Sequence, residues 1–82
     1  MHYVYLLESE SAAGQRYVGA TSDLKKRLAE HNAGKSSHTS KFKFMPWKLA
    51  TYVAFSDSRK AEVFERYLKS GSGHAFARKR LW

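Results

Sequence analysis

The chain has 82 residues, which is short for more than one domain, and its 43% hydrophobic and 15% aromatic content excludes a disordered tail, so we expect residues 1–82 to form a single packed domain. The absence of cysteine excludes disulfides and thiolate sites and fits the cytoplasm, and no apolar run approaches the roughly 20 residues of a membrane span. The 15 Lys and Arg against 7 Asp and Glu give a net charge of +8 and a pI near 10.0. This charge indicates a polyanionic partner, and nucleic acid is favoured over an anionic membrane surface.

A β-hairpin is predicted at the start of the chain. Residues 3–7 are apolar and rich in Tyr and Val, which is typical of a strand, and a polar connection over 8–15 leads to a second strand at 16–19. Strands joined in this way normally pair antiparallel. Because alternate side chains share a face, Tyr5 and Tyr17 are expected on one face together with Gly19.

The next predicted element is a helix from Asp23 to Asn32, capped by Thr21 or Ser22 and ended by Gly34. One stripe of this helix, at the spacing i, i+3, i+4 and i+7, consists of Leu24, Arg27, Leu28 and His31. Arg27 and His31 therefore interrupt an apolar seam. The structural alternative for Arg27 is a buried stem with its charged head in water.

Residues 34–46 are basic and show no regular period, so they predict a loop. Lys35, Lys41 and Lys43 of this loop, with Lys26 of the preceding helix, are candidates for contacts with nucleic-acid phosphates. Trp47 to Phe55 then alternates as a third strand does, which predicts one shared face for Leu49, Thr51, Val53 and Phe55.

Two more helices are predicted in the last third of the chain. The first runs from Ser58 to about Ser70 behind a cap at Ser56 or Asp57, and its apolar stripe contains one carboxylate, Glu65. Such a carboxylate needs a cation, a metal ion or hydrogen bonds, and a structural partner such as Arg27 is the alternative to a functional role. Residues 71–73 are expected to form a turn before a last helix, 74–81.

The element order is therefore β-β-α-β-α-α, and the fold class predicted is α+β, a small antiparallel three-stranded sheet with flanking helices. The charge is unevenly distributed over this order. Residues 1–23 hold one basic and three acidic residues, a net −2, whereas residues 24–82 hold 14 basic and four acidic residues, a net +10. A positive field of this kind is the usual footprint of a nucleic-acid-binding surface.

The unusual polar residues of these elements form a plausible set for cleaving phosphodiester bonds. An Arg donates hydrogen bonds to a phosphate whose charge grows in the transition state, and a Glu offers the hard oxygen ligands that Mg²⁺ prefers. Tyr and His side chains transfer protons. No second carboxylate stands out near Glu65, so we expect a single Mg²⁺ (or Mn²⁺) ion and no organic cofactor.

At these residues the sequence resembles the GIY-YIG nuclease superfamily, in particular small stand-alone bacterial members related to the N-terminal nuclease domain of a DNA excision-repair protein. The resemblance covers nearly the whole chain. It is carried by Tyr3–Tyr5 (YVY), by Tyr17–Gly19 (YVG), by residues 21–34 (TSDLKKRLAEHNAG), by Trp47–Leu49 and by residues 61–73.

The resemblance implies a metal-dependent DNA endonuclease with catalytic roles for Tyr5, Tyr17, Arg27, His31 and Glu65. In the implied mechanism Glu65 holds the metal ion and Arg27 stabilises the phosphate. Tyr17 or Tyr5 helps to activate the water, with Tyr17 favoured as the base and Tyr5 as its support, and His31 relays protons. The chain departs from the family pattern at Tyr3, where the family has Gly, and in lacking a late Asn. The alternative is therefore a non-catalytic nucleic-acid-binding domain that retains the nuclease scaffold.

Overall fold

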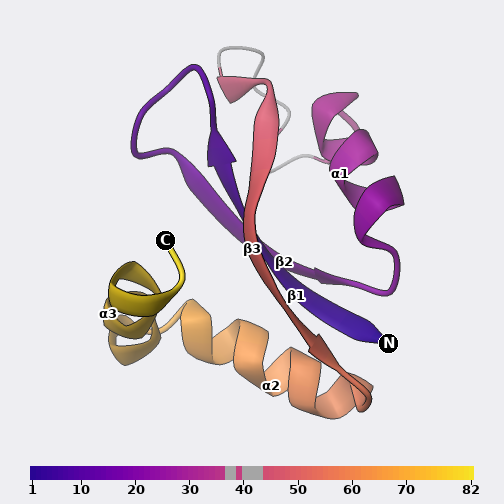
Figure 1. Ribbon diagram of the computed structural model, residues 1–82, viewed down its shortest axis with the longest axis vertical. Coiled ribbons are helices and arrows are strands. Elements are labelled where there is room, and N and C mark those ends of the chain that lie inside the picture. Colours follow the sequence, from indigo (N-terminus) through magenta and orange to yellow (C-terminus); the bar gives the residue numbers. More distant parts are fainter. Residues whose placement is uncertain (37–38, 40–43) are drawn as a thin grey trace.

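The computed structural model describes residues 1–36, 39 and 44–82 and contains one three-stranded antiparallel sheet and three helices (Figure 1). The strands are β1 (His2–Ser9), β2 (Arg16–Thr21) and β3 (Trp47–Phe55), and the helices are α1 (Leu24–Asn32), α2 (Ser58–Leu68) and α3 (Gly71–Arg80). The order along the sheet is β2-β1-β3. The predicted α+β class and the order β-β-α-β-α-α are confirmed.

The hairpin of β1 and β2 has the predicted pairing. Tyr5 lies opposite Gly19 and Leu7 lies opposite Tyr17, so all four residues share one face of the sheet. The turn between the strands includes Gly14, whose φ of 84° lies in the left-handed region that glycine adopts without strain. Since β1 is the central strand, its residues from Val4 to Leu7 are fully buried and divide the core into two parts.

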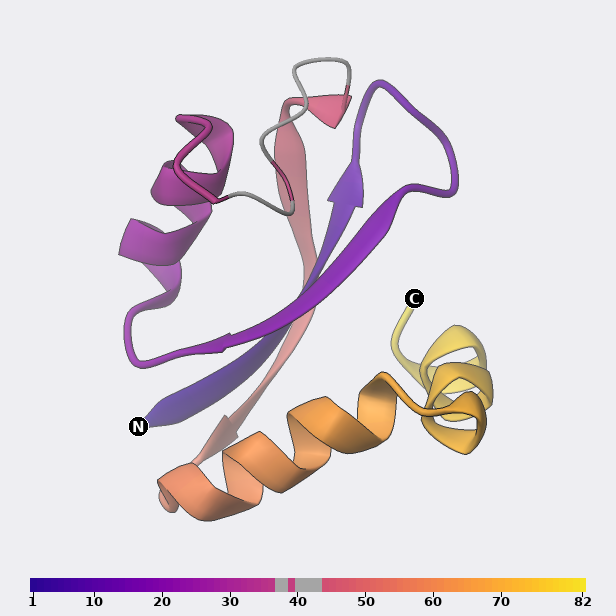
Figure 2. The same cartoon turned by 180° about the vertical axis from the view of Figure 1, so that it is seen from behind.

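The two faces of the sheet are covered by different helices, as Figures 1 and 2 show. On one face, Tyr5 and Leu7 pack with Trp47 and with side chains of α1. On the other face, Val4 and Leu6 pack with side chains of α2 and α3. No helix within the described residues is long and apolar enough to cross a lipid bilayer. The edge strand β2 therefore has α1 on one side and α2 on the other.

Two helix starts differ from the prediction. The cap of α1 is Asp23, whose carboxylate accepts a hydrogen bond from the backbone N–H of Lys26, and not Thr21 or Ser22. Helix α3 begins at Gly71, because Ser70 caps it by accepting from the N–H of Gly73. The predicted turn at 71–73 is therefore wrong: these residues form the first turn of α3, with Gly73 packed against the Tyr67 carbonyl of α2.

The alternation predicted for β3 is broken by a β-bulge. Leu6 pairs with Thr51, but the next residue, Leu7, pairs with Leu49, so one residue of β3 has no partner at this point. The bulge moves Leu49 to the face of Tyr5 and leaves Phe55 on the opposite face. The prediction of one shared face for Leu49 and Phe55 is therefore wrong, since a strict period of two does not survive an inserted residue.

Candidate active site

Three aromatic rings form the centre of the candidate site on the α1 side of the sheet. The ring centroids of Tyr17 and His31 are 5.0 Å apart, those of Tyr5 and His31 5.6 Å, and those of Tyr5 and Tyr17 6.2 Å. Gly19, opposite Tyr5 on β2, makes this packing possible: a Cβ atom at this position would overlap the Tyr5 hydroxyl and lie 2.9 Å from Cε2 of Tyr17. The two tyrosines therefore require glycine at position 19.

His31 lies fully buried at the end of α1 and connects Tyr5 to the segment that follows the helix. Its Nε2 is 2.8 Å from the hydroxyl of Tyr5, and its Nδ1 is 2.5 Å from Oγ1 of Thr39. Thr39 is also fully buried, and its carbonyl accepts a hydrogen bond of 3.1 Å from the Trp47 indole. These contacts fix the imidazole at both nitrogens.

The protonation of these hydrogen-bonded side chains follows from their burial. Burial raises the pKa of Tyr5 to about 12, against a hydrogen bond from Arg27 that lowers it. Burial, with the nearby charge of Arg27, lowers the pKa of His31 to about 4. At neutral pH both groups are therefore uncharged. The Tyr5 hydroxyl shares one hydrogen bond with Nε2 of His31, and the Thr39 hydroxyl shares another with Nδ1, so the uncharged ring donates at one of these nitrogens and accepts at the other.

Arg27 is held beside Tyr5 and His31 by an acidic neighbour on its own helix. Its Nη1 is 3.0 Å from Oε1 of Glu30, and both side chains are about one third exposed, at 32% and 30%. The hydrogen bond with Glu30, followed by that with Tyr5, raises the pKa of Arg27. The guanidinium is thus neither free in water nor paired with Glu65. Its i, i+3 spacing from Glu30 is a signal in the sequence that predicts this pair.

Glu65 reaches the site from α2. Its Oε2 is 3.1 Å from Nζ of Lys69, four residues later on the helix, and its side chain is 24% exposed. The same ammonium group lies 6.0 Å from the ring centroid of Tyr17, and the carboxylate is near enough to raise the pKa of Tyr5. All five predicted residues therefore gather at the β2 edge of the sheet, where α1 and α2 lie on opposite sides (Figure 1).

The carboxylates of the site fit a metal ion with one protein ligand. No group of three or more His, Asp or Glu side chains in the described ranges is arranged to hold a metal ion. Glu65 offers a partly exposed carboxylate whose present partner is a cation, the Lys69 ammonium, whereas the Glu30 carboxylate is bonded to Arg27. Hard oxygen atoms of this kind suit Mg²⁺, which keeps several waters and binds through one or two carboxylates together with phosphate.

The two predicted phosphate-binding lysines that the structure describes, Lys26 and Lys35, lie outside this cluster. Lys26 is exposed on α1 at a polar hollow of about 290 Å³, which Arg27 and Glu30 also line. Lys35 is exposed just after α1, with its backbone N–H bonded to the Glu30 carbonyl. Lys41 and Lys43 lie outside the described residues.

Two residues of the site were not identified from the sequence. Thr39 contacts His31 from a segment without periodicity, and no pattern in the sequence pointed to it. Lys69 carries a weak signal, because it lies four residues after Glu65 on the same predicted helix, a spacing typical of ion pairs.

The buried, uncharged His31 predicts a pH-dependent stability. The unfolded chain binds a proton at His31 below the ordinary pKa of 6.5, whereas the folded protein resists protonation down to about 4. The contribution of His31 to the free energy of unfolding is therefore complete above pH 6.5 and is lost as the pH falls to about 4, a change of about 3 kcal/mol. Urea titrations across this range measure it. The variant His31→Gln is expected to show a shallower pH profile, and parallel profiles for the two proteins would contradict the prediction.

Comparison with known proteins gives a family match over almost the entire chain. The family model of the GIY-YIG catalytic domain matches residues 1–79. A UPF0213 protein of Streptococcus pyogenes serotype M5 is 46% identical over 61 residues, which are 74% of this chain and 62% of the relative, and a serotype M3 homologue is 44% identical over the same length. The matched region thus spans less than two thirds of these relatives. The solution NMR structure of a UPF0213 protein from Bacillus halodurans superposes with a TM-score of 0.55 at 29% identity, covering 95% of this chain and 82% of that one.

Proposed function

Because the chain belongs to the GIY-YIG family, as its sequence suggested, we propose that it is a metal-dependent endonuclease that hydrolyses phosphodiester bonds in DNA. The observation that carries the proposal is the series of hydrogen bonds from Thr39 through His31 to Tyr5, with Arg27 beside it and Glu65 near it on α2. A cluster of this composition at a sheet edge, on a nuclease scaffold, is best explained as a catalytic site.

Arg27 is proposed to bind the scissile phosphate. A guanidinium presents planar donors that match phosphate oxygens, and it keeps its charge at every relevant pH. The Glu30 carboxylate orients the group from one side, and the remaining donors are available to a substrate because the side chain is 32% exposed. As charge grows on the phosphate oxygens in the transition state, the interaction with Arg27 strengthens.

The two tyrosines are proposed to have different roles. Tyr5 is 2% exposed and its pKa is raised to about 12, so it keeps its proton and acts by donating to His31. Tyr17 is less buried and contacts the same imidazole ring, which favours it as the group that activates the attacking water. His31, uncharged and bonded at both nitrogens, is proposed to pass a proton between the tyrosines and Thr39.

Glu65 is proposed to hold one Mg²⁺ (or Mn²⁺) ion. The ion replaces the Lys69 ammonium as the partner of the Glu65 carboxylate. When bound, such an ion supplies charge stabilisation for the phosphate and its leaving oxygen. Lys26 and Lys35, together with Lys41 and Lys43, are proposed to contact the DNA backbone outside the cleavage site. Their role is to strengthen binding at low salt without selecting a base sequence.

The test is a cleavage assay with purified protein on supercoiled plasmid, in Mg²⁺, in Mn²⁺ and in EDTA. Nicking that requires a divalent ion is expected. Branched DNA, single strands and matched RNA substrates, assayed in parallel, rank the substrates. Salt-dependent binding without turnover under every metal would contradict the proposal and would instead indicate the non-catalytic nucleic-acid-binding domain.

A further inference from the structure

A second hollow adjoins the candidate active site on the other side of Tyr17. It has a volume of about 410 Å³ and lies where β2, the end of α2, the start of α3 and the last residue meet. Its lining includes Arg16, Tyr17, Lys69, His74 and Trp82. The ring centroid of Tyr17 lies 5.0 Å from that of His31 and 6.0 Å from Nζ of Lys69. The Tyr17 side chain therefore separates this groove from the cluster around His31.

The groove has the charge of an anion-binding surface. Its described lining includes Arg16, Lys69 and His74 and no acidic residue, and the Lys69 ammonium is bonded to the Glu65 carboxylate beside the groove at 3.1 Å. The guanidinium carbon of Arg16 lies 4.7 Å from the Trp82 ring centroid, and Trp82 itself packs against the core cluster under α2 and α3. Arg16 is therefore held in place by a cation–π contact, although its residue is exposed.

The groove also offers apolar and aromatic surface between its cations. Its lining includes the apolar side chains of Val18 and Leu68 and the aromatic rings of Tyr17 and Trp82. Alternation of cations with aromatic rings is the pattern by which proteins follow a nucleic-acid strand, with phosphates on the cations and bases or sugars on the rings. A volume of about 410 Å³ lies in the range of small-ligand sites.

We infer that this groove is a nucleotide subsite, which takes the phosphate and base of the nucleotide next to the bond that is cut. The inference rests on the proposed function for the position of the cut, but binding in the groove is separable from cleavage. Arg16 binds the phosphate in this arrangement, joined by Lys69 when its ammonium leaves Glu65, and the base lies against the aromatic side chains. Tyr17 is the boundary between this subsite and the reacting phosphate.

The decisive variant is Arg16→Gln, which removes one charge from an exposed position of the groove. Binding is measured in EDTA by fluorescence anisotropy with a short labelled oligothymidylate, over a series of salt concentrations. We expect the affinity for the oligonucleotide to fall about 5- to 10-fold. The slope of the logarithm of the affinity against the logarithm of the salt concentration is expected to correspond to about one fewer released counterion.

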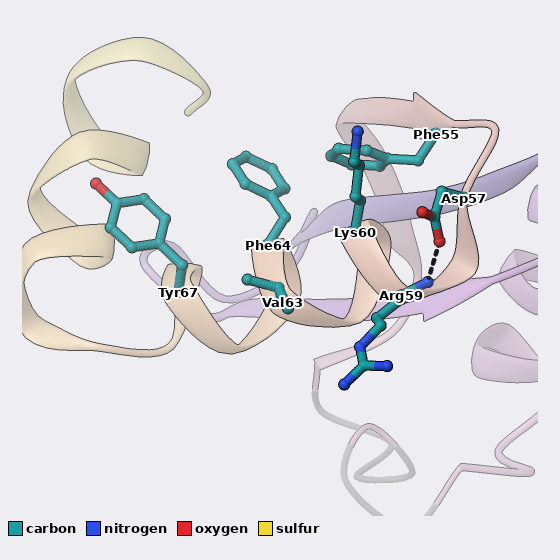
Figure 3. A pocket seen from close by; sticks show the side chains of 7 residues that line it. All are labelled: Phe55, Asp57, Arg59, Lys60, Val63, Phe64 and Tyr67. Atoms are coloured by element: carbon teal, nitrogen blue, oxygen red, sulfur yellow. Dashed lines mark hydrogen bonds between the residues drawn. The ribbon is translucent and has the colours of Figure 1, made fainter.

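Arg59→Gln is the matched control, because it removes the same charge from α2 at a site that lies away from the groove. Arg59 lines an apolar hollow of about 610 Å³ near the start of α2 (Figure 3), ten residues and about 15 Å along the helix from Lys69. This variant is expected to stay within about twofold of the wild-type affinity. Equal losses for Arg16→Gln and Arg59→Gln would overturn the subsite, as would no binding of the oligonucleotide to the wild-type protein.

Tryptophan fluorescence provides a second measurement. The chain has two tryptophans, and Trp47 is only 4% exposed, so quenching by the oligonucleotide is expected to come from Trp82 and to disappear in Trp82→Phe. Unchanged quenching in that variant would overturn the subsite. If the protein binds through the groove but never nicks DNA, the proposed function fails and the subsite stands. If it nicks DNA and Arg16→Gln raises KM no more than Arg59→Gln, only the subsite fails.

Discussion

Replacement of Glu65 by Gln is expected to lower Mg²⁺-dependent nicking by at least about 100-fold while DNA binding stays within about twofold. The change keeps the size of the side chain but removes the charge that attracts a divalent cation. It breaks an ion pair with Lys69 that is partly exposed and worth only a few tenths of a kcal/mol, so the fold is expected to remain intact. Plasmid nicking and a gel-shift titration measure the two quantities.

The matched control is Glu62→Gln, which makes the same chemical change one turn earlier on α2. Glu62 is exposed and is not part of the cluster around Tyr5. This variant is expected to nick DNA at the wild-type rate. If Glu65→Gln were as active as Glu62→Gln, Glu65 would be excluded from the mechanism, and the metal ion would have to bind elsewhere or have no role.

Replacement of Gly19 by Ala is expected to damage both the stability of the protein and the candidate site. The added Cβ would overlap the hydroxyl end of Tyr5 and press on Tyr17, and β1 and β2 are paired at this point, so the backbone has little freedom to move. We expect a loss of about 1–3 kcal/mol in the free energy of unfolding, since overpacking forces side chains out of their preferred rotamers. Displacement of Tyr5 also breaks its bond to His31, so nicking is expected to fall further than stability alone explains.

Gly71→Ala is the control for this variant. A Cβ at position 71 has no neighbour within 4 Å, and the residue lies in the first turn of α3, where Ala is well tolerated. Denaturant unfolding of the two variants gives the difference in stability, and nicking per folded molecule gives the effect on the site. Equal stability of Gly19→Ala and the wild type would show that Tyr5 and Tyr17 can move apart without cost.

Much of the site was predictable because its residues contradict the pattern of their elements. Arg27 and His31 interrupt an apolar stripe at helical spacing, and Glu65 does so on α2, and each of these positions depends only on the period of a helix. Tyr5, Tyr17 and Gly19 share a face because a hairpin with this spacing pairs in one register. These are local consequences of the sequence, and the structure brings the five predicted residues to one edge of the sheet.

Features that depend on a particular neighbour were not predictable in this way. The bulge in β3 and the contact of Gly73 with α2 both arise from packing between elements, and they moved Leu49 to another face and extended α3 to Gly71. A pair with Arg27 was the structural alternative for Glu65. In the structure each of the two charges instead pairs within its own helix, Arg27 with Glu30 and Glu65 with Lys69.

By itself the sequence determined the order of the elements, the polar residues that break their apolar stripes, and the concentration of positive charge after residue 23. These depend on short-range periods and on composition. Only the tertiary structure decided that His31 is uncharged and bonded to both Tyr5 and Thr39, and that Tyr17 separates two adjoining hollows of the surface. Burial and the direction of a side chain depend on which elements pack against it, and that is fixed only when the sheet and its helices come together.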